Sequence, residues 1–143
     1  SSIIIDYLVR TQPAAACLMP SDPDLAMQTR LIDRLVDGYI HAPFQQIVAE
    51  RMRPGGQHDP YGVDKARAQI RSGYSVVAPM IAGPWAMADC AALPALFYAE
   101  YAVSLTDWPD LASYLGRLKA RPSVARVLAE AEPFFQYFPL KNG

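Results

Sequence analysis

The stretch "PWAMADCAALPALFYAE", from Pro84 to Glu100, decides how this chain folds. It is nearly all apolar, yet a single acid, Asp89, lies inside it, and Pro94 interrupts its second half. A membrane-spanning helix needs about 20 consecutive apolar residues, and this run is shorter and carries a charge. The stretch therefore predicts a buried helix of a globular protein.

Helix capping explains why one acid is present in this run. In a capping box, an acidic side chain at the third helical position reaches back to the backbone amide of the N-cap residue. With Ala86 as the N-cap, Asp89 takes that third position, and Trp85 and Cys90 take the two positions of a hydrophobic staple. Asp89 would also face the positive end of the helix dipole. We interpret Asp89 as a structural cap and not as a catalytic carboxylate.

Composition indicates one globular domain whose net charge is too small to create a strong electrostatic field. The chain has 143 residues, of which 52% are hydrophobic and 19% charged, and its net charge of −1 draws it to neither nucleic acid nor a membrane surface. Cys17 and Cys90 stand in apolar surroundings, so we expect both to be buried and reduced. No signal peptide is present, which favours a cytoplasmic protein. The two distant histidines, His41 and His58, predict no metal site.

Helical spacing dominates the remainder, and the fold class is predicted to be all-α. We expect a bundle of five or six helices: a short one opened by serines, a long one from Asp22 that kinks at Pro43, a third that bends at Pro79, the Pro84–Glu100 helix, and two short ones, the second starting at Pro122. A proline-bounded aromatic tail follows, for which core packing is favoured over the border of a pocket.

Several stretches resemble one family. Residues 85–89, Trp-Ala-Met-Ala-Asp, resemble the capping-box pattern hydrophobic–Ser/Thr–x–Ala–Asp of the glutathione transferase C-terminal domain. The stretch "RLIDRLVDGYIHAPFQQIVAERMRP" (30–54) resembles its long kinked helix, and "WPDLASYLGRLKARPSVARVL" (108–128) resembles its next two helices after the capped one. The opening "SSIIIDYL" is similar to the end of the family's thioredoxin-like half. These motifs occur in the family's order over nearly the whole chain.

The resemblance implies a domain layout and a reaction. Residues 1–10 would be the last helix of an otherwise missing thioredoxin-like domain, 11–22 a linker, and 23–143 the helical C-terminal domain. The parent protein would be a cytoplasmic detoxification enzyme that conjugates glutathione to hydrophobic electrophiles. Its other half would bind glutathione and activate the thiol, and this part would supply the pocket for the co-substrate. The part alone is expected to be inactive.

The resemblance also nominates site residues. Ser1, with Ser2 beside it, matches the motif serine that binds the γ-glutamyl carboxylate of glutathione, which fits an anion at a helix N-terminus. Tyr39, His41 and Phe44 fall in the region that lines the co-substrate pocket. His41 would lie near the glutathione sulfur as a catalytic residue, where an imidazole favours the thiolate. A surface or packing role for this histidine beside a proline is the alternative.

The sequence departs from the family in two places. Ala86 replaces the usual Ser or Thr cap, and loss of such a hydroxyl costs roughly 0.5–2 kcal/mol. The joint before the capped helix is short, so either the loop near Gly83 is truly reduced or residues are missing there. Neither departure identifies the physiological electrophile or the class of the enzyme.

Partners follow from the resemblance as well. Family members are usually homodimers with the kinked helix and the next one at the interface, so Arg67 and Arg71 would either face a partner or remain solvated. No nucleic acid, membrane or metal is expected. The rival hypothesis is a non-catalytic protein-interaction module with the same helical domain, and a weaker one is an unrelated bundle with similar caps.

Overall fold

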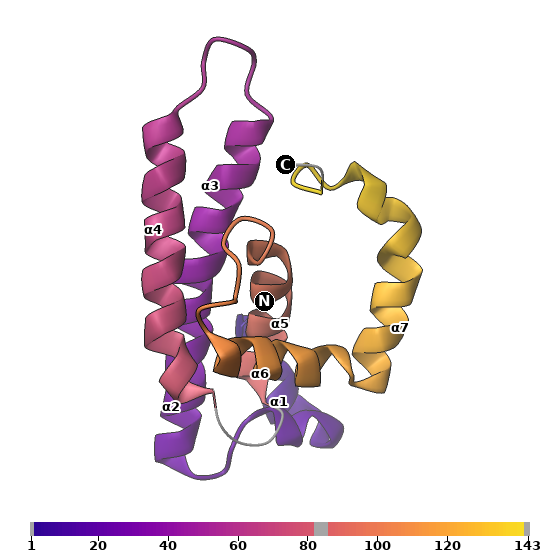
Figure 1. The fold of residues 1–143 in the computed structure, drawn as a ribbon. Helices are drawn as coiled ribbons and strands as arrows, with labels where there is room; N and C mark the ends of the chain where they lie inside the picture. Colours follow the sequence, from indigo (N-terminus) through magenta and orange to yellow (C-terminus); the bar gives the residue numbers. More distant parts are fainter. Residues whose placement is uncertain (1, 82–85, 142–143) are drawn as a thin grey trace.

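Helix follows helix along the computed structural model, which describes residues 2–81 and 86–141 (Figure 1). The α-helices are α1 (Ser2–Thr11), α2 (Pro23–Val36), α3 (Ala42–Arg51), α4 (Pro60–Val77), α5 (Met87–Ala99), α6 (Pro109–Lys119) and α7 (Pro122–Ala131). Four shorter helical segments join them: η1 (Pro13–Leu18), η2 (Asp37–His41), η3 (Ala78–Met80) and η4 (Glu132–Tyr137). The prediction of an all-α fold is confirmed for the described residues.

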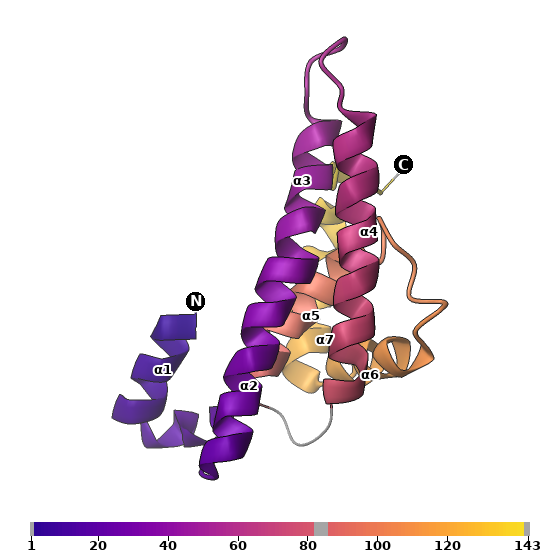
Figure 2. The same cartoon turned by 90° about the vertical axis from the view of Figure 1, so that its left-hand side faces the viewer.

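The helix count rises to seven because the predicted long helix is divided. Its start is the predicted one: Asp22 is the N-cap of α2 and accepts from the amides of Asp24 and Leu25 at 3.0 and 2.9 Å. Just before Pro43, where the sequence predicts a kink, the chain makes a π-helical turn, η2, in which the Ala42 amide donates to the Asp37 carbonyl five residues back. The helix then continues as α3, so α2 and α3 form one long rod (Figure 2).

The rod and α4 run antiparallel side by side (Figures 1 and 2), and α5 packs on one face of this pair, behind it in Figure 2. Helix α6 crosses below α5, and α7 stands to one side and leads through η4 back towards α3 (Figure 1). One continuous core joins the rod, α4, α5 and α6, and it includes Ile40 and Phe44 of the rod, Tyr74 of α4, Leu96 of α5 and Leu111 of α6. The α3–α4 pair therefore forms one wall of the molecule and α5 its centre.

Gly73 permits the close contact between α4 and the π-helical turn. A Cβ atom at this position would lie 2.8 Å from the Tyr39 carbonyl oxygen, which is closer than real Cβ contacts. No side chain larger than hydrogen fits there without moving the backbone of one helix. The glycine thus fixes how near α4 comes to η2.

Helix α1 is held to the bundle mainly by polar contacts. The Ser2 hydroxyl donates to Asp33 at 2.7 Å, and Arg30 pairs with Asp6 at 3.0 Å. Its apolar side chains face outwards: Ile3 is 79% exposed and Tyr7 64%. Among the helices described, none is long and apolar enough to cross a membrane.

Candidate functional site

The site residues predicted from the sequence lie in two regions of the structure. Ser1 is outside the described residues, as is Gly83 of the short joint. Ser2 lies at the start of α1, where its hydroxyl is already engaged with Asp33 of α2. Tyr39 and His41 belong to the π-helical turn, and Phe44 follows at the start of α3. The start of α1 therefore contacts the rod at Asp33, whereas Tyr39, His41 and Phe44 belong to the rod itself.

His41 and Tyr39 are accessible, whereas Phe44 is buried. Tyr39 is half exposed, and the His41 ring is partly covered, with its Nε2 atom 3.5 Å from the side-chain amide nitrogen of Gln45. The Phe44 side chain is only 2% exposed and contacts the rings of Tyr98 and Phe138, with centroids 6.2 and 6.3 Å away. Phe44 thus belongs to the core and also forms part of the wall of a cavity.

That wall belongs to an open aromatic cavity of about 390 Å³ between α3, α5 and η4. Its volume lies within the range of small-molecule sites. We call it the aromatic cavity, and it is lined by Phe44, Gln45, Val48, Tyr98, Ala131, Phe134, Phe135, Tyr137 and Phe138. Tyr39 and His41 are not among its lining residues, although Gln45 connects His41 to its edge. The tail aromatics therefore border a cavity; Phe138 also packs against the core, as predicted, whereas Phe134 and Tyr137 are exposed.

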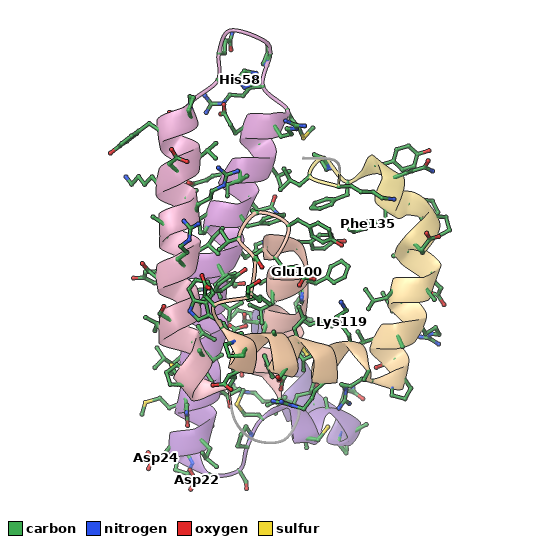
Figure 3. All side chains as sticks on the ribbon, viewed as in Figure 1. Asp22, Asp24, His58, Glu100, Lys119 and Phe135 are labelled. Atoms are coloured by element: carbon green, nitrogen blue, oxygen red, sulfur yellow. The ribbon has the colours of Figure 1, made fainter. Side chains whose placement is uncertain are left out.

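A larger apolar groove of about 640 Å³ lies next to this cavity, between α5, α7 and η4. It shares Tyr98, Ala131 and Phe135 with the aromatic cavity. Two ammonium groups lie over its rings: Lys119 is 5.4 Å from the centroid of Phe97, and Lys141 is 5.7 Å from that of Phe135. Figure 3 shows Lys119 and Phe135 directed into the space between α5 and α7.

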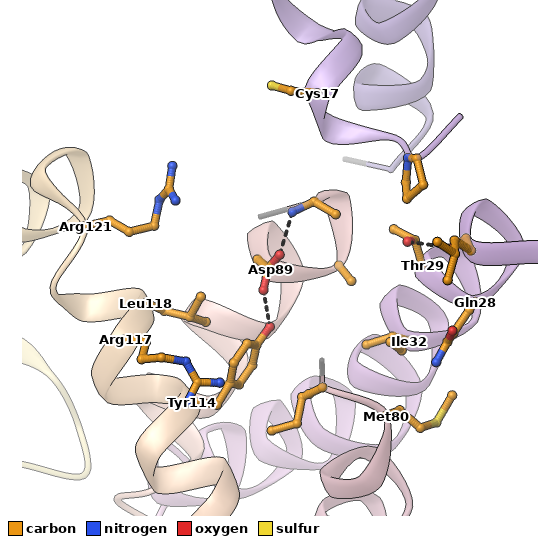
Figure 4. A pocket seen from close by; sticks show the side chains of 15 residues that line it. Cys17, Gln28, Thr29, Ile32, Met80, Asp89, Tyr114, Arg117, Leu118 and Arg121 are labelled. Atoms are coloured by element: carbon orange, nitrogen blue, oxygen red, sulfur yellow. Dashed lines mark hydrogen bonds between the residues drawn. The ribbon is translucent and has the colours of Figure 1, made fainter. Parts of the chain in front are cut away.

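A third cavity, of about 350 Å³, is more polar and surrounds Asp89 (Figure 4). Asp89 is buried, and its Oδ2 accepts from the Ala86 amide at 2.6 Å, as a capping acid does. Its Oδ1 accepts from the Tyr114 hydroxyl, which lies on α6. Burial and this bond hold the pKa of Tyr114 well above its usual range, so the phenol stays a donor. Both carboxylate oxygens are thus engaged: Oδ2 caps the start of α5, and Oδ1 joins α5 to α6.

Ala86 leaves this capping box half formed. An alanine has no side-chain acceptor, and the Asp89 amide bonds to the Ala86 carbonyl instead, at 3.0 Å. The contact from Asp89 back to the N-cap amide is present all the same. The helix start therefore depends on Asp89 more than a complete box would.

Comparison with solved structures shows which known fold this arrangement of helices matches. A glutathione S-transferase from Methylobacterium radiotolerans, in complex with glutathione sulfonate, superposes on 87% of the chain with a TM-score of 0.75 and 26% sequence identity. The chain has the glutathione S-transferase fold. The all-helical arrangement of the described residues matches a C-terminal-like helical domain of that fold, as the sequence predicted. The chain spans 63% of the length of the Methylobacterium protein.

Comparisons with protein-family models and with curated proteins gave no match.

The environments of the two cysteines differ from the prediction that both are buried. Cys17 was expected to be buried, but it is exposed on η1, because that short segment lies on the surface. Cys90 is half-buried, and burial with the nearby Asp89 carboxylate raises the pKa of its thiol. Cys90 is therefore a poor nucleophile at neutral pH.

The described part of this glutathione S-transferase fold brings together no group of three or more side chains that would suit a metal ion. His58 lies in the exposed loop before α4, 3.2 Å from Glu50, far along the chain from His41.

Among the residues that line the aromatic cavity, the sequence analysis did not single out Gln45 and Tyr98. Gln45 stands one turn after His41, a spacing that could have drawn attention to it.

Proposed function

We propose that the protein is a glutathione transferase in which this chain holds the hydrophobic electrophile. The observation that carries the proposal is the aromatic cavity beside Phe44 in a chain with the glutathione S-transferase fold. Six of the nine side chains that line the cavity are aromatic rings. Such rings bind flat apolar molecules by burial and stacking.

The proposed chemistry is an attack of the glutathione thiolate on an electrophilic carbon. The sulfur forms a bond to that carbon, and the leaving group departs with the electron pair of the bond that breaks. The aromatic cavity holds the electrophile near the sulfur, which converts a bimolecular encounter into a positioned one. His41, on the accessible side of η2, is proposed as the catalytic residue that favours the thiolate by donating a hydrogen bond.

Glutathione binding is proposed to involve the start of α1. Ser1 would receive the γ-glutamyl carboxylate at the N-terminus of this helix, with Ser2 beside it. The Methylobacterium protein was crystallised with glutathione sulfonate, which supports glutathione as the ligand of this fold. The contact of Ser2 with Asp33 would keep this helix end in place on the rod.

The proposed layout assigns residues 1–10 to a thioredoxin-like domain, 11–22 to a linker and 23–143 to the helical domain. The exposure of Ile3, Ile4 and Tyr7 on α1 supports it, because contiguous apolar side chains of this size are normally covered. We further propose a cytoplasmic, detoxifying homodimer. Arg71, exposed on α4, and Arg67, one turn before it, are the proposed partner contacts.

Two measurements on the full-length protein test the proposal. We expect retention on immobilised glutathione and turnover of chlorodinitrobenzene with glutathione. His41→Ala should lower kcat, whereas the matched change His58→Ala, in the exposed loop, should not. Absence of both binding and turnover would refute the enzyme and favour the interaction module, and equal rates for the two histidine variants would remove the role of His41.

A further inference from the structure

Gln45 links the accessible histidine to the aromatic cavity. It belongs to α3, one turn after His41, and it lines the cavity together with Phe44. Among the lining residues it has the only carboxamide, and the hydroxyls of Tyr98 and Tyr137 are the other side-chain hydrogen-bonding groups. Its side chain therefore brings a strong donor to the edge of a surface made mostly of carbon.

The contact with His41 leaves part of this amide available. The amide nitrogen lies 3.5 Å from Nε2 of the imidazole, so one N–H donates there when Nε2 carries no proton. A carboxamide has a second N–H. Gln45 is exposed, and no other protein hydrogen bond of its side chain is found among residues 2–81 and 86–141. The second N–H is thus accessible to a molecule in the cavity.

We propose that Gln45 is a specificity-determining residue that selects electrophiles with an acceptor oxygen, nitro or carbonyl, conjugated to the reacting carbon. The inference rests on the proposed function, because it places the reacting carbon on the His41 side of the cavity. An electrophile whose ring packs in the cavity against the wall formed by Phe44, Tyr98 and Phe138 then presents the substituent next to that carbon to Gln45.

The chemistry explains why a donor at this place acts on the rate. When the thiolate attacks a halogenated nitroarene, the new C–S bond pushes an electron pair into the ring and onto the nitro oxygens. Halide departure with the C–halogen pair then restores the ring. A hydrogen bond from Gln45 to a nitro oxygen strengthens as negative charge develops there, so it stabilises the transition state more than the substrate. Displacement of bromide from benzyl bromide develops no such charge on oxygen.

The test compares two electrophiles with the full-length protein. In Gln45→Leu, kcat/KM for chlorodinitrobenzene should fall about tenfold, the effect of one partly exposed hydrogen bond to a developing charge, while benzyl bromide should react within about twofold of the parent rate. Gln45→Glu, which replaces the N–H donor by an acceptor, should lose at least as much on the nitroarene. Gln46→Leu is the matched control, because Gln46 is the next residue, is exposed and does not line the cavity.

The outcomes separate this inference from the proposed function. If the parent protein turns over neither electrophile, the glutathione transferase proposal fails first. If it turns over both and Gln45→Leu slows them by the same factor, or Gln46→Leu changes their ratio as much, then Gln45 does not select the substrate. A changed ratio in Gln45→Leu alone, with an unchanged circular dichroism spectrum, supports the inference.

Discussion

The hydrogen bond between Tyr114 and Asp89 should contribute more stability than an ordinary buried hydroxyl bond. Tyr114→Phe keeps the ring and its contact with the Arg117 guanidinium, 5.7 Å from the ring centroid, and removes only the hydroxyl. A hydrogen bond to a charged group contributes about 1.5–3 kcal/mol, and its loss leaves one oxygen of a buried carboxylate without a donor. For a chain of 143 residues this corresponds to a fall in Tm of about 5–10 °C.

Tyr74→Phe provides a matched control for this prediction. Tyr74 is completely buried, and its hydroxyl donates to the neutral carbonyl of Val103 at 3.3 Å. Removing that bond should cost about 0.5–1.5 kcal/mol, because neither partner is charged. Urea unfolding followed by circular dichroism gives both losses under one set of conditions. The two variants differ mainly in the charge of the acceptor.

A double-mutant cycle assigns the effect to Asp89. Asp89→Asn should destabilise the parent protein more than it destabilises Tyr114→Phe, with a coupling energy of about 1–2 kcal/mol. Equal losses for Tyr114→Phe and Tyr74→Phe, together with a coupling energy near zero, would show that Asp89 does not join α5 to α6 as the structure indicates. Asp89 would then need another explanation for its burial.

Three further outcomes are expected. Ala86→Ser should complete the capping box and raise the free energy of unfolding by about 0.5–1 kcal/mol in urea unfolding, and no gain would mean that the first turn already satisfies its amides. Gly73→Ala should lower Tm because its Cβ would lie 2.8 Å from a backbone oxygen, whereas Gly116→Ala, with nothing within 4 Å, should raise Tm slightly; similar shifts for both would contradict the close approach of α4. Burial raises the pKa of Glu100 above its ordinary value near 4.5, so ionising it costs folding free energy that grows as pH rises through this region. Glu100→Gln should therefore stabilise the protein more at pH 7 than at pH 4, and a pH-independent effect would exclude this cause.

Local rules predicted most of the fold. Asp22 starts α2, Pro122 opens α7, and Pro79 lies in the short turn that ends α4, all as their conformational preferences require. The role of Asp89 also followed from its position three residues after the N-cap. Each of these features depends on residues close together in sequence, which is why the sequence reveals them.

Contacts between distant residues were not predictable in this way. The bond from Tyr114 to Asp89 joins positions 25 residues apart, and nothing in either helix alone specifies it. The aromatic cavity requires η4 to return to α3, so the sequence favoured core packing for the tail aromatics over the pocket border that Phe135 and Phe138 form. The exposure of Cys17 likewise depends on where η1 lies relative to the bundle.

The π-helical turn explains how one long rod keeps its apolar face inside. Ile32, Val36, Ile40 and Phe44 follow one another at intervals of four residues, and all four are buried. In a regular α-helix of 3.6 residues per turn, each interval of four rotates the side chain by about 40° past a full turn, so such a series soon leaves the core. A π-helical turn has more residues per turn, so four residues fall short of a full turn, which reverses that rotation.

The π-helical turn lies between Val36 and Phe44, where this correction is needed. Pro43 favours it there because proline has no amide hydrogen to donate to the carbonyl four residues earlier. The same turn leaves His41 partly accessible while Phe44 stays in the core, so the feature that preserves the fold also shapes the candidate site.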